Sequence, residues 1–280
     1  LCSDQVFVGV GSDDVLAMVF LTFFNSGKPV FFPDITYSFY DVWADMLRIP
    51  YETKALDDAF EIRAEDYYGE NGGVIFPNPN APTGVLQSLE DIEDIIKHNQ
   101  DVIVIVDEAY IDFGGRSALP FIEKYDNVVI VQTFSKSRSM AGARIGYAMA
   151  NEKLIRYLND VKYSFNSYTM NAPAIALGVP AVKDREYFEK TVQHVIATRE
   201  RVKVELKALG FVFEDSISNF LFVTHPEISM VQLFADLRKE GIIVRHFDKP
   251  ERIWEYLRIT IGTDAQMDTL LSFLREYLKK

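Results

Sequence analysis

The stretch DVIVIVDEAY, residues 101–110, indicates the fold class of this 280-residue chain. Its unbroken apolar run, without alternating polar residues, is typical of a strand covered on both faces, as in a parallel sheet between helices. A second run of this kind, NVVIVQTF, follows at 127–134. Short apolar segments alternate with amphipathic ones around both runs. This alternation predicts an α/β fold with a mostly parallel sheet flanked by helices.

The rest of the first half continues this pattern of strands and helices. Ser12 and Ser88 stand where helix caps are expected, because a serine oxygen accepts hydrogen bonds from the free amides of a first turn. In such sheets the functional residues gather at the carboxyl ends of the strands. The predicted strands span residues 5–10, 28–33, 72–79 and 143–150, and the predicted helices span 12–25, about 37–48 and 88–98.

The second half changes character near residues 150–165, where we place the boundary between two expected domains. Long helical patterns come first, and short strands interleaved with helices follow, which predicts a smaller α+β domain with a mostly antiparallel sheet. The helical patterns cover 151–160, about 170–182, 184–209, 229–240 and 264–279, and the expected strands cover 211–214, 219–224, 242–247 and 256–262.

Composition excludes several classes of protein. The formal net charge of −12 argues against nucleic acid and anionic membranes as partners. No apolar run reaches the roughly 20 residues of a membrane-spanning helix. Cys2 is the only cysteine and the four histidines are scattered, so the sequence predicts neither disulfides nor a metal site. A cytoplasmic protein acting on small molecules fits these features best.

Polar and ionisable residues follow four of the predicted strands. Because these strands end at one rim of the sheet, we expect their following residues to lie close together. The residues are Gly11, Ser12 and Asp13 after the first strand, Asn80 after 72–79, Asp107 and Tyr110 at the end of 101–110, and Ser135, Lys136 and Arg144 after 127–134.

This set suits pyridoxal phosphate (PLP), an aldehyde cofactor. An aldehyde needs a primary amine to form a Schiff base, and Lys136 offers one. The pyridine nitrogen stays protonated only beside a carboxylate, which Asp107 supplies. Asn80 and Tyr110 carry donors for the phenolic oxygen of the ring.

The remaining residues suit the cofactor's phosphate. A phosphate favours backbone amides at a helix N-terminus, a hydroxyl and a guanidinium. Tyr37, at a predicted helix start, is a candidate for stacking on the ring face. The phosphate donors would be Gly11, Ser12, Asp13, Ser135 and Arg144.

Each signal has an ordinary explanation when taken alone. A lone Lys136 reads as a surface lysine, and NPNAPTG (78–84) reads as a turn. The run Gly9-Val10-Gly11 resembles the start of a dinucleotide-binding loop, with Asp34 as the ribose carboxylate, but Asp14 occupies the third glycine position. That alternative, an oxidoreductase, leaves Lys136 without a role. The joint occurrence at strand ends favours PLP.

The chain resembles the aspartate-aminotransferase-like superfamily of PLP enzymes, and within it most closely the histidinol-phosphate aminotransferases. The resemblance implies a three-layer α/β/α PLP-binding domain at 1–155, and connecting helices with an α+β domain at 156–280. It rests on GSDD (11–14), FFPDITYSFY (31–40), FPNPNAPTG (76–84), VDEAYIDF (106–113), TFSKSRSMAGARIGY (133–147) and YLRITIGT (256–263).

The resemblance also implies roles for individual residues. Lys136 carries the cofactor and Asp107 pairs with its pyridinium, with Tyr110 as the third catalytic residue. Arg258 grips the substrate carboxylate or phosphate, assisted by Arg245. The family's positions for the ring and phosphate contacts match Tyr37, Asn80, Tyr110, Gly11, Ser12, Asp13, Ser135 and Arg144, with Asn80 also near the substrate, and Asn166 matches an asparagine whose role stays open.

The activity implied is histidinol-phosphate transamination in histidine biosynthesis, EC 2.6.1.9, by a homodimer. Family members carry an N-terminal arm before the first strand seen here, and we expect it to be absent from this chain. An aromatic-amino-acid aminotransferase or a threonine-phosphate decarboxylase would keep everything around Lys136. A non-catalytic descendant would have lost Lys136 or Asp107, and both are present.

Overall fold

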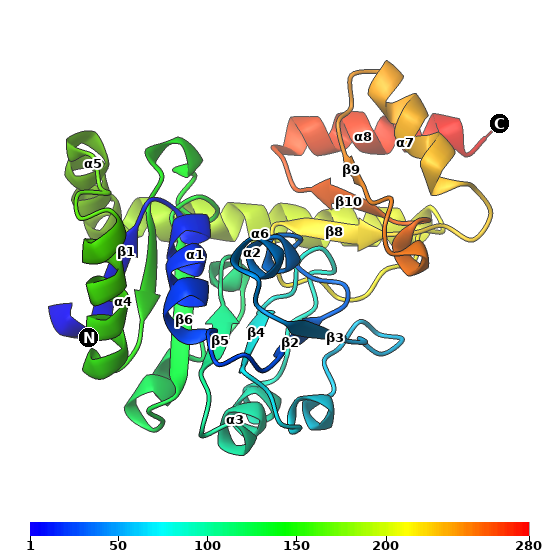
Figure 1. Cartoon of the computed structure of the whole chain (residues 1–280). Coiled ribbons are helices and arrows are strands. Elements are labelled where there is room, and N and C mark those ends of the chain that lie inside the picture. Colours follow the sequence, from blue (N-terminus) through cyan, green and yellow to red (C-terminus); the bar gives the residue numbers. More distant parts are fainter. Residues whose placement is uncertain (280) are drawn as a thin grey trace.

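Two β-sheets organise residues 1–279, the part of the chain that the computed structural model describes (Figure 1). The larger sheet has the strand order β1-β7-β6-β5-β4-β2-β3, and the smaller one has the order β8-β10-β9. The larger sheet consists of β1 (Val6–Gly9), β2 (Val30–Pro33), β3 (Tyr51–Lys54), β4 (Gly73–Pro77), β5 (Val104–Asp107), β6 (Val128–Thr133) and β7 (Gly146–Met149).

The larger sheet is mostly parallel, as predicted. Strands β3, β2, β4, β5 and β6 are parallel neighbours, whereas β7 runs antiparallel to both β6 and β1. The carboxyl ends of β1, β2, β3, β4, β5 and β6 therefore share one rim with the beginning of β7. All seven strands of the sheet thus end or begin at this rim.

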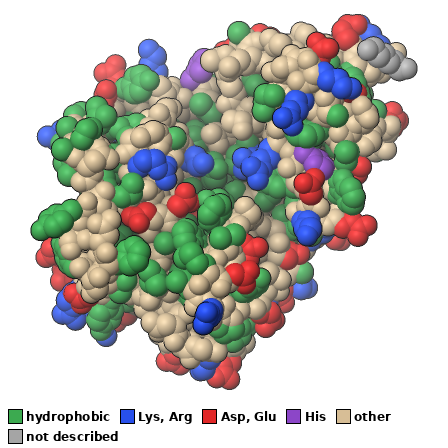
Figure 2. Space-filling model, turned by 45° about the horizontal axis from the view of Figure 1, so that its top comes forward, with side chains coloured by type: hydrophobic (Ala, Val, Ile, Leu, Met, Phe, Trp, Pro, Cys, Tyr) green, Lys and Arg blue, Asp and Glu red, His purple; other side chains and the backbone are tan. Residues whose placement is uncertain are grey.

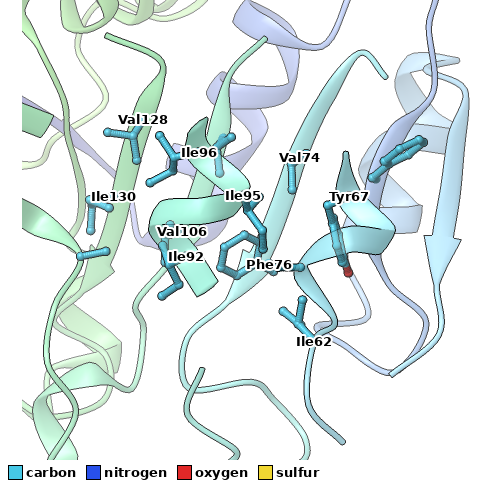
Figure 3. Packing of buried hydrophobic residues seen from close by; sticks show 14 of the residues in the cluster. Ile62, Tyr67, Val74, Phe76, Ile92, Ile95, Ile96, Val106, Val128 and Ile130 are labelled. Atoms are coloured by element: carbon cyan, nitrogen blue, oxygen red, sulfur yellow. The ribbon is translucent and has the colours of Figure 1, made fainter. Parts of the chain in front are cut away.

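Helices cover both faces of the larger sheet, which confirms the predicted layered α/β fold. On one face α3 packs Ile92, Ile95 and Ile96 against strand residues such as Phe76 and Val106 (Figure 3). On the other face α1, α2 and α4 bury their apolar residues. We call the seven-stranded sheet with these helices the large lobe. Its helices are α1 (Ser12–Phe23), α2 (Tyr40–Leu47), α3 (Leu89–His98) and α4 (Glu152–Phe165).

The smaller sheet is antiparallel throughout, also as predicted. Together with α7 and α8 it forms what we call the small lobe, whose core includes Val202 and Leu206 of α6. Its elements are β8 (Phe220–Val223), β9 (Arg245–His246), β10 (Leu257–Thr260), α7 (Met230–Lys239) and α8 (Asp264–Tyr277), while α5 (Ala172–Lys183) and α6 (Arg185–Ala208) precede them.

Three local expectations were wrong or incomplete. The first helix is capped by Gly11 and begins at Ser12, so Ser12 is not its cap. The expected strand 211–214 forms only an isolated bridge between Val212 and Thr224. Strand β3 (Tyr51–Lys54) was not predicted, because its exposed, charged residues lack the apolar alternation of a half-buried strand.

Within residues 1–279, every helix is too short or too polar to cross a lipid bilayer.

Candidate active site

The rim of the large sheet surrounds a cavity of about 160 Å³. Loops after β1, β5 and β6 and the segment before β7 supply most of its wall. The strand topology thus brings together residues that lie more than 100 positions apart in the sequence. The lining residues are Ser12, Asp13, Tyr37, Pro77, Ala81, Asp107, Ala109, Tyr110, Ser135, Lys136, Ala141 and Arg144.

Lys136 lies in a tight turn directly after β6. The carbonyl oxygen of Lys136 accepts a hydrogen bond from the amide of Ser139 at 3.0 Å, which closes the turn. Its side chain is half-buried, and Nζ lies 5.2 Å from the centroid of the Tyr110 ring. The neighbouring Ser137 donates a hydrogen bond to Asp112, in the segment that follows Tyr110. The lysine and tyrosine loops are therefore joined beside the cavity.

Asp107 is the last residue of β5 and is only 4% exposed. The Tyr40 hydroxyl donates to its Oδ2 at 3.0 Å, and the amide of Ala109 donates to its Oδ1 at 3.2 Å. Burial raises the pKa of Asp107 from its ordinary value of 3.8 to about 6, even though these two donors favour the ionised form. A cation bound beside this carboxyl would offset the cost of burial, so the site suits a positively charged ring nitrogen.

The N-terminus of α1 offers a cradle for an anion. No side chain within residues 1–279 caps this 12-residue helix, and its N-cap residue Gly11 has a φ of 92°. A Cβ at Gly11 would lie 2.4 Å from Nη2 of Arg144, so glycine makes room for the guanidinium. Free amides beside an arginine form a binding site for a phosphate.

Asp13 and Tyr37 brace this cradle. Nη2 of Arg144 lies 3.7 Å from Oδ2 of Asp13, and the Tyr37 hydroxyl donates to Oδ1 of Asp13 at 2.6 Å. Burial raises the pKa of Tyr37, and the Asp13 carboxylate acts in the same direction, so the hydroxyl stays protonated. The ring of Tyr37 remains at the cavity wall.

Within the chain, the side-chain amide of Asn80 is held by two neighbouring segments. Its Nδ2 donates to the carbonyl of Ile35 at 2.9 Å and to Oγ1 of Thr83 at 3.0 Å. Its buried Oδ1 finds no partner among the described residues. The next residue, Ala81, lines the cavity. The predicted contact of Asn80 with the phenolic oxygen stays a prediction.

A larger cavity of about 830 Å³ adjoins the first one and shares Lys136, Tyr37 and Tyr110 with it. Its far wall comes from the small lobe and includes Arg245 and Arg258, which face each other in the register of β9 and β10. Figure 2 shows Lys and Arg side chains gathered across the middle of one face of the molecule, with Asp and Glu more frequent toward the edges.

The guanidinium of Arg258 is mostly buried and has a hydrogen-bond donor left free by the described residues, so it suits an anionic ligand. Its guanidinium lies 4.9 Å from the ring centroid of Phe220, and its buried Nε has no hydrogen-bond partner within the described part of the chain. Burial lowers the pKa of Arg258, and the nearby Arg245 also lowers it. A carboxylate or phosphate between the two guanidiniums would satisfy the free donor and relieve this repulsion.

Sequence reasoning missed Tyr40, whose hydroxyl contacts Asp107, because an aromatic residue in an amphipathic helix reads as core. It also missed Arg252, which contacts the large lobe from the small one. Asn166 lies at the exposed C-terminal end of α4 and lines neither cavity.

Comparison with known proteins identifies the family. The model of the family described as "Aminotransferase class I and II" matches residues 2–274. The chain belongs to this family. Curated relatives include the histidinol-phosphate aminotransferase of Lactococcus lactis subsp. cremoris, which is 52% identical over 279 residues; the match covers 100% of this chain and 78% of the relative. The Clostridium acetobutylicum enzyme of the same name is 52% identical over 272 residues, 97% of this chain and 77% of its own.

Solved structures agree with this aminotransferase fold. A histidinol-phosphate aminotransferase structure from Clostridium acetobutylicum superimposes with a TM-score of 0.90 at 24% identity, covering 98% of this chain and 84% of that one. The Sinorhizobium meliloti enzyme, solved in complex with pyridoxal-5'-phosphate, gives a TM-score of 0.88 at 23% identity, covering 99% and 77%. The layered α/β fold expected from the sequence is that of these aminotransferases.

Proposed function

We propose that this aminotransferase uses pyridoxal phosphate to exchange an amino group between L-histidinol phosphate and 2-oxoglutarate, giving imidazole-acetol phosphate and L-glutamate. The observation that carries the proposal is that Lys136, Asp107 and the α1 N-terminus line one cavity. The adjoining cavity shares Lys136 with it and is lined by Arg245 and Arg258. The name and 52% identity of the Lactococcus lactis relative support the choice of substrate.

The residues present fit the cofactor. The uncapped N-terminus of α1 and Arg144 would hold its phosphate, and Asp107 would balance the charge of its pyridinium. Lys136 would attach to its aldehyde carbon. When bound, pyridoxal phosphate supplies a ring that withdraws electrons from the substrate's α-carbon.

The chain's own side chains would carry out the remaining work. Once the incoming amino donor has displaced Nζ from the cofactor, Lys136 would take the proton from the donor's α-carbon with this free amine and act as general base. Arg258 and Arg245 hold the anionic end of the substrate, which is a carboxylate in glutamate and a phosphate in histidinol phosphate. Two guanidiniums on neighbouring strands suit both anions, so one pocket serves both halves of a ping-pong exchange.

The proposal extends to the assembly. We include in it a PLP-binding domain at 1–155, connecting helices with an α+β domain at 156–280, and a homodimer working in the cytoplasm. Light scattering after size-exclusion chromatography tests the homodimer, because a molar mass of 32.0 kDa in solution would indicate a monomer instead.

A substitution of Lys136 tests the activity. Lys136→Ala is expected to lower kcat by about 10³-fold or more, because it removes both the covalent attachment and the general base. The assay follows glutamate formation from histidinol phosphate and 2-oxoglutarate. Borohydride reduction with peptide mapping should place the cofactor label on Lys136. The exposed Lys153 on α4 provides the matched control, and Lys153→Ala should keep the kcat of the unmodified chain.

Two outcomes would contradict the proposal. A Lys136→Ala variant with unchanged kcat would exclude this lysine as the catalytic group. The second outcome is turnover of an aromatic amino acid, or decarboxylation of threonine phosphate, without any reaction of histidinol phosphate. It would agree with the proposed cofactor and contradict the proposed substrate.

A further inference from the structure

The segment between β9 and β10 joins the two strands that carry Arg245 and Arg258. Its 3-10 helix (Glu251–Ile253) places Arg252 against the large lobe. Nη1 of Arg252 donates to the carbonyl of Leu56 at 2.6 Å, and Nη2 donates to the carbonyl of Asp57. One guanidinium thus binds two consecutive carbonyls nearly 200 positions away in the sequence.

The accepting loop is itself firmly held. Oδ1 of Asp57 accepts hydrogen bonds from the amides of Ala59 at 2.9 Å and Glu61 at 2.8 Å. The amide of Leu56 donates to Oδ1 of Asp34, which follows β2. The two carbonyls that meet Arg252 are therefore fixed to the large sheet and make a stable attachment point.

Phe60 completes the contact. It is 6% exposed and adopts a φ of 60°, a left-handed conformation that is costly for a bulky residue. Its ring lies 4.9 Å below the guanidinium of Arg252, and its other neighbours are Tyr256 at 5.5 Å and Phe222 at 5.8 Å. Phe60, a large-lobe residue, is thus held in a strained conformation and packs against Phe222 and Tyr256 of the small lobe.

This junction borders the larger cavity. Phe247 and Ile253, at the two sides of Arg252 in the sequence, both line that cavity together with Arg245 and Arg258. Phe247 also packs on Phe222 at 5.8 Å. The position of the cavity's far wall relative to Lys136 therefore depends on how the segment around Arg252 is attached.

We propose that Arg252 is a positioning residue that fixes the Arg245–Arg258 pair at the correct distance from Lys136 for the substrate anion. Arginine suits this role because its planar group donates to two carbonyls while stacking on an aromatic ring, which the single ammonium of lysine does not reproduce. The identity of the anion as a phosphate ester rests on the proposed function.

The test compares Arg252→Lys and Arg252→Met with Arg238→Met, an exposed arginine on α7 in the same lobe. Inorganic phosphate serves as the probe, and its dissociation constant is measured by calorimetry on the PLP-loaded protein. We expect both Arg252 variants to weaken phosphate binding and raise KM for histidinol phosphate about tenfold. The PLP dissociation constant and the kcat should change less than threefold, and Arg238→Met should change nothing.

Each result decides the matter. A lower melting temperature with unchanged phosphate binding and KM, in a folded Arg252→Lys variant, would make Arg252 a stability contact and overturn the proposal. Loss of PLP binding would overturn it as well, because the effect would then extend beyond the anion pocket. If phosphate binding responds to Arg252 while the unmodified chain leaves histidinol phosphate unchanged, the positioning role stands and the proposed substrate fails.

Discussion

Asp107 is a buried carboxyl group at the wall of the smaller cavity. Its carboxyl is buried beside the Tyr40 hydroxyl and the Ala109 amide, and burial raises its pKa to about 6. In the cofactor-free protein the neutral form is therefore favoured relative to the unfolded chain. A pyridinium placed beside Asp107 would reverse this preference, so cofactor binding and the charge state of Asp107 are coupled.

This coupling predicts a pH dependence of stability for the cofactor-free protein. The folded pKa of Asp107 lies above its ordinary value of 3.8, so the folded state binds more protons between these values. The stabilisation of the folded state by protonated Asp107 is fully present below pH 3.8 and is lost as pH rises through about 6. At 1.36 kcal/mol per pKa unit, it amounts to about 2 to 3 kcal/mol. Urea unfolding between pH 4 and pH 8 measures it.

The control is Asp107→Asn, which has no proton to exchange. As pH rises from 4 to 8, the unmodified chain should lose free energy of unfolding through Asp107, and the variant should not. The decrease over this range should therefore be about 2 kcal/mol smaller in the variant. Burial also raises the pKa of Glu108 to about 7, and since the substitution leaves its hydrogen-bond partners Ser117, Gln132 and Ala118 in place, its contribution should cancel in the difference. Identical pH profiles for the two proteins would show that Asp107 does not titrate in this range.

At the residue scale, the sequence predicted those functional residues that stand out from the apolar residues around them. Lys136 and Asp107 follow apolar strands, where a charge is costly without a purpose, so both were recognisable. Tyr40 and Arg252 were not recognisable. Tyr40 occupies a helix position that reads as core, and the partners of Arg252 are backbone carbonyls, which leave no mark in the sequence.

At the scale of elements, the close approach of β1, α1 and β7 shapes the proposed phosphate site at the α1 N-terminus. Gly146, at the start of β7, pairs with Gly9 and Thr133 in the two neighbouring strands. A Cβ at Gly146 would lie 2.3 Å from the backbone carbonyl carbon of Gly11 and the amide nitrogen of Ser12. The close approach of β7 to the α1 N-terminus therefore requires glycine.

Gly146→Ala should displace the beginning of α1. We expect the free energy of unfolding to fall by about 1 to 3 kcal/mol through overpacking. The PLP dissociation constant should rise at least about tenfold, because the amides that would hold the phosphate move. Absorbance titration with PLP and urea unfolding provide the two measurements.

Gly142 supplies the matched control, since within the described residues a Cβ there meets no atom inside 4 Å. Gly142→Ala should keep PLP affinity within about twofold. An unchanged PLP dissociation constant in Gly146→Ala would contradict the prediction and show that PLP binding does not depend on the exact position of the α1 N-terminus.

Element prediction succeeded where apolar periodicity was strong and failed where it was weak. Strands β5 and β6, buried on both faces, were evident from their unbroken apolar runs. Strand β3 at the sheet edge is held by pairing with β2 rather than by its own apolar residues, so its sequence gave little signal. The cap of α1 was misassigned because Ser12 lies one residue inside the helix, and Gly11, with its positive φ, stands at the N-cap.

At the scale of the whole molecule, Arg199 joins the two lobes from the middle of α6. The side chain is 3% exposed, and Nη1 donates to the carbonyls of Phe113 and Ser218, both at 2.9 Å. Phe113 belongs to the loop that carries Tyr110, and Ser218 precedes β8. The parallel and antiparallel sheets were predicted from the sequence, but the relative placement of the lobes depends on such contacts with backbone atoms and was not predictable.

Arg199→Met should lower the free energy of unfolding by about 2 to 4 kcal/mol, because two buried carbonyls lose their donor. Urea unfolding measures the change. Arg201→Met is the control on the same helix, since Arg201 pairs with Asp264 and Asp268 at the surface and its loss should cost at most about 1 kcal/mol. Equal losses in the two variants would contradict the role of Arg199.

Helix α6 contributes to two hydrophobic clusters, with Val192 packed beside Tyr110 and Phe113, and Val202 and Leu206 packed under the small sheet. Each inserted or deleted residue turns the rest of a helix by about 100° and shifts it by about 1.5 Å. Such a change between Val192 and Val202 would carry one set of apolar residues out of its core. An insertion or deletion along this stretch should therefore destabilise the fold, so the length of α6 sets the separation of the two clusters that it joins.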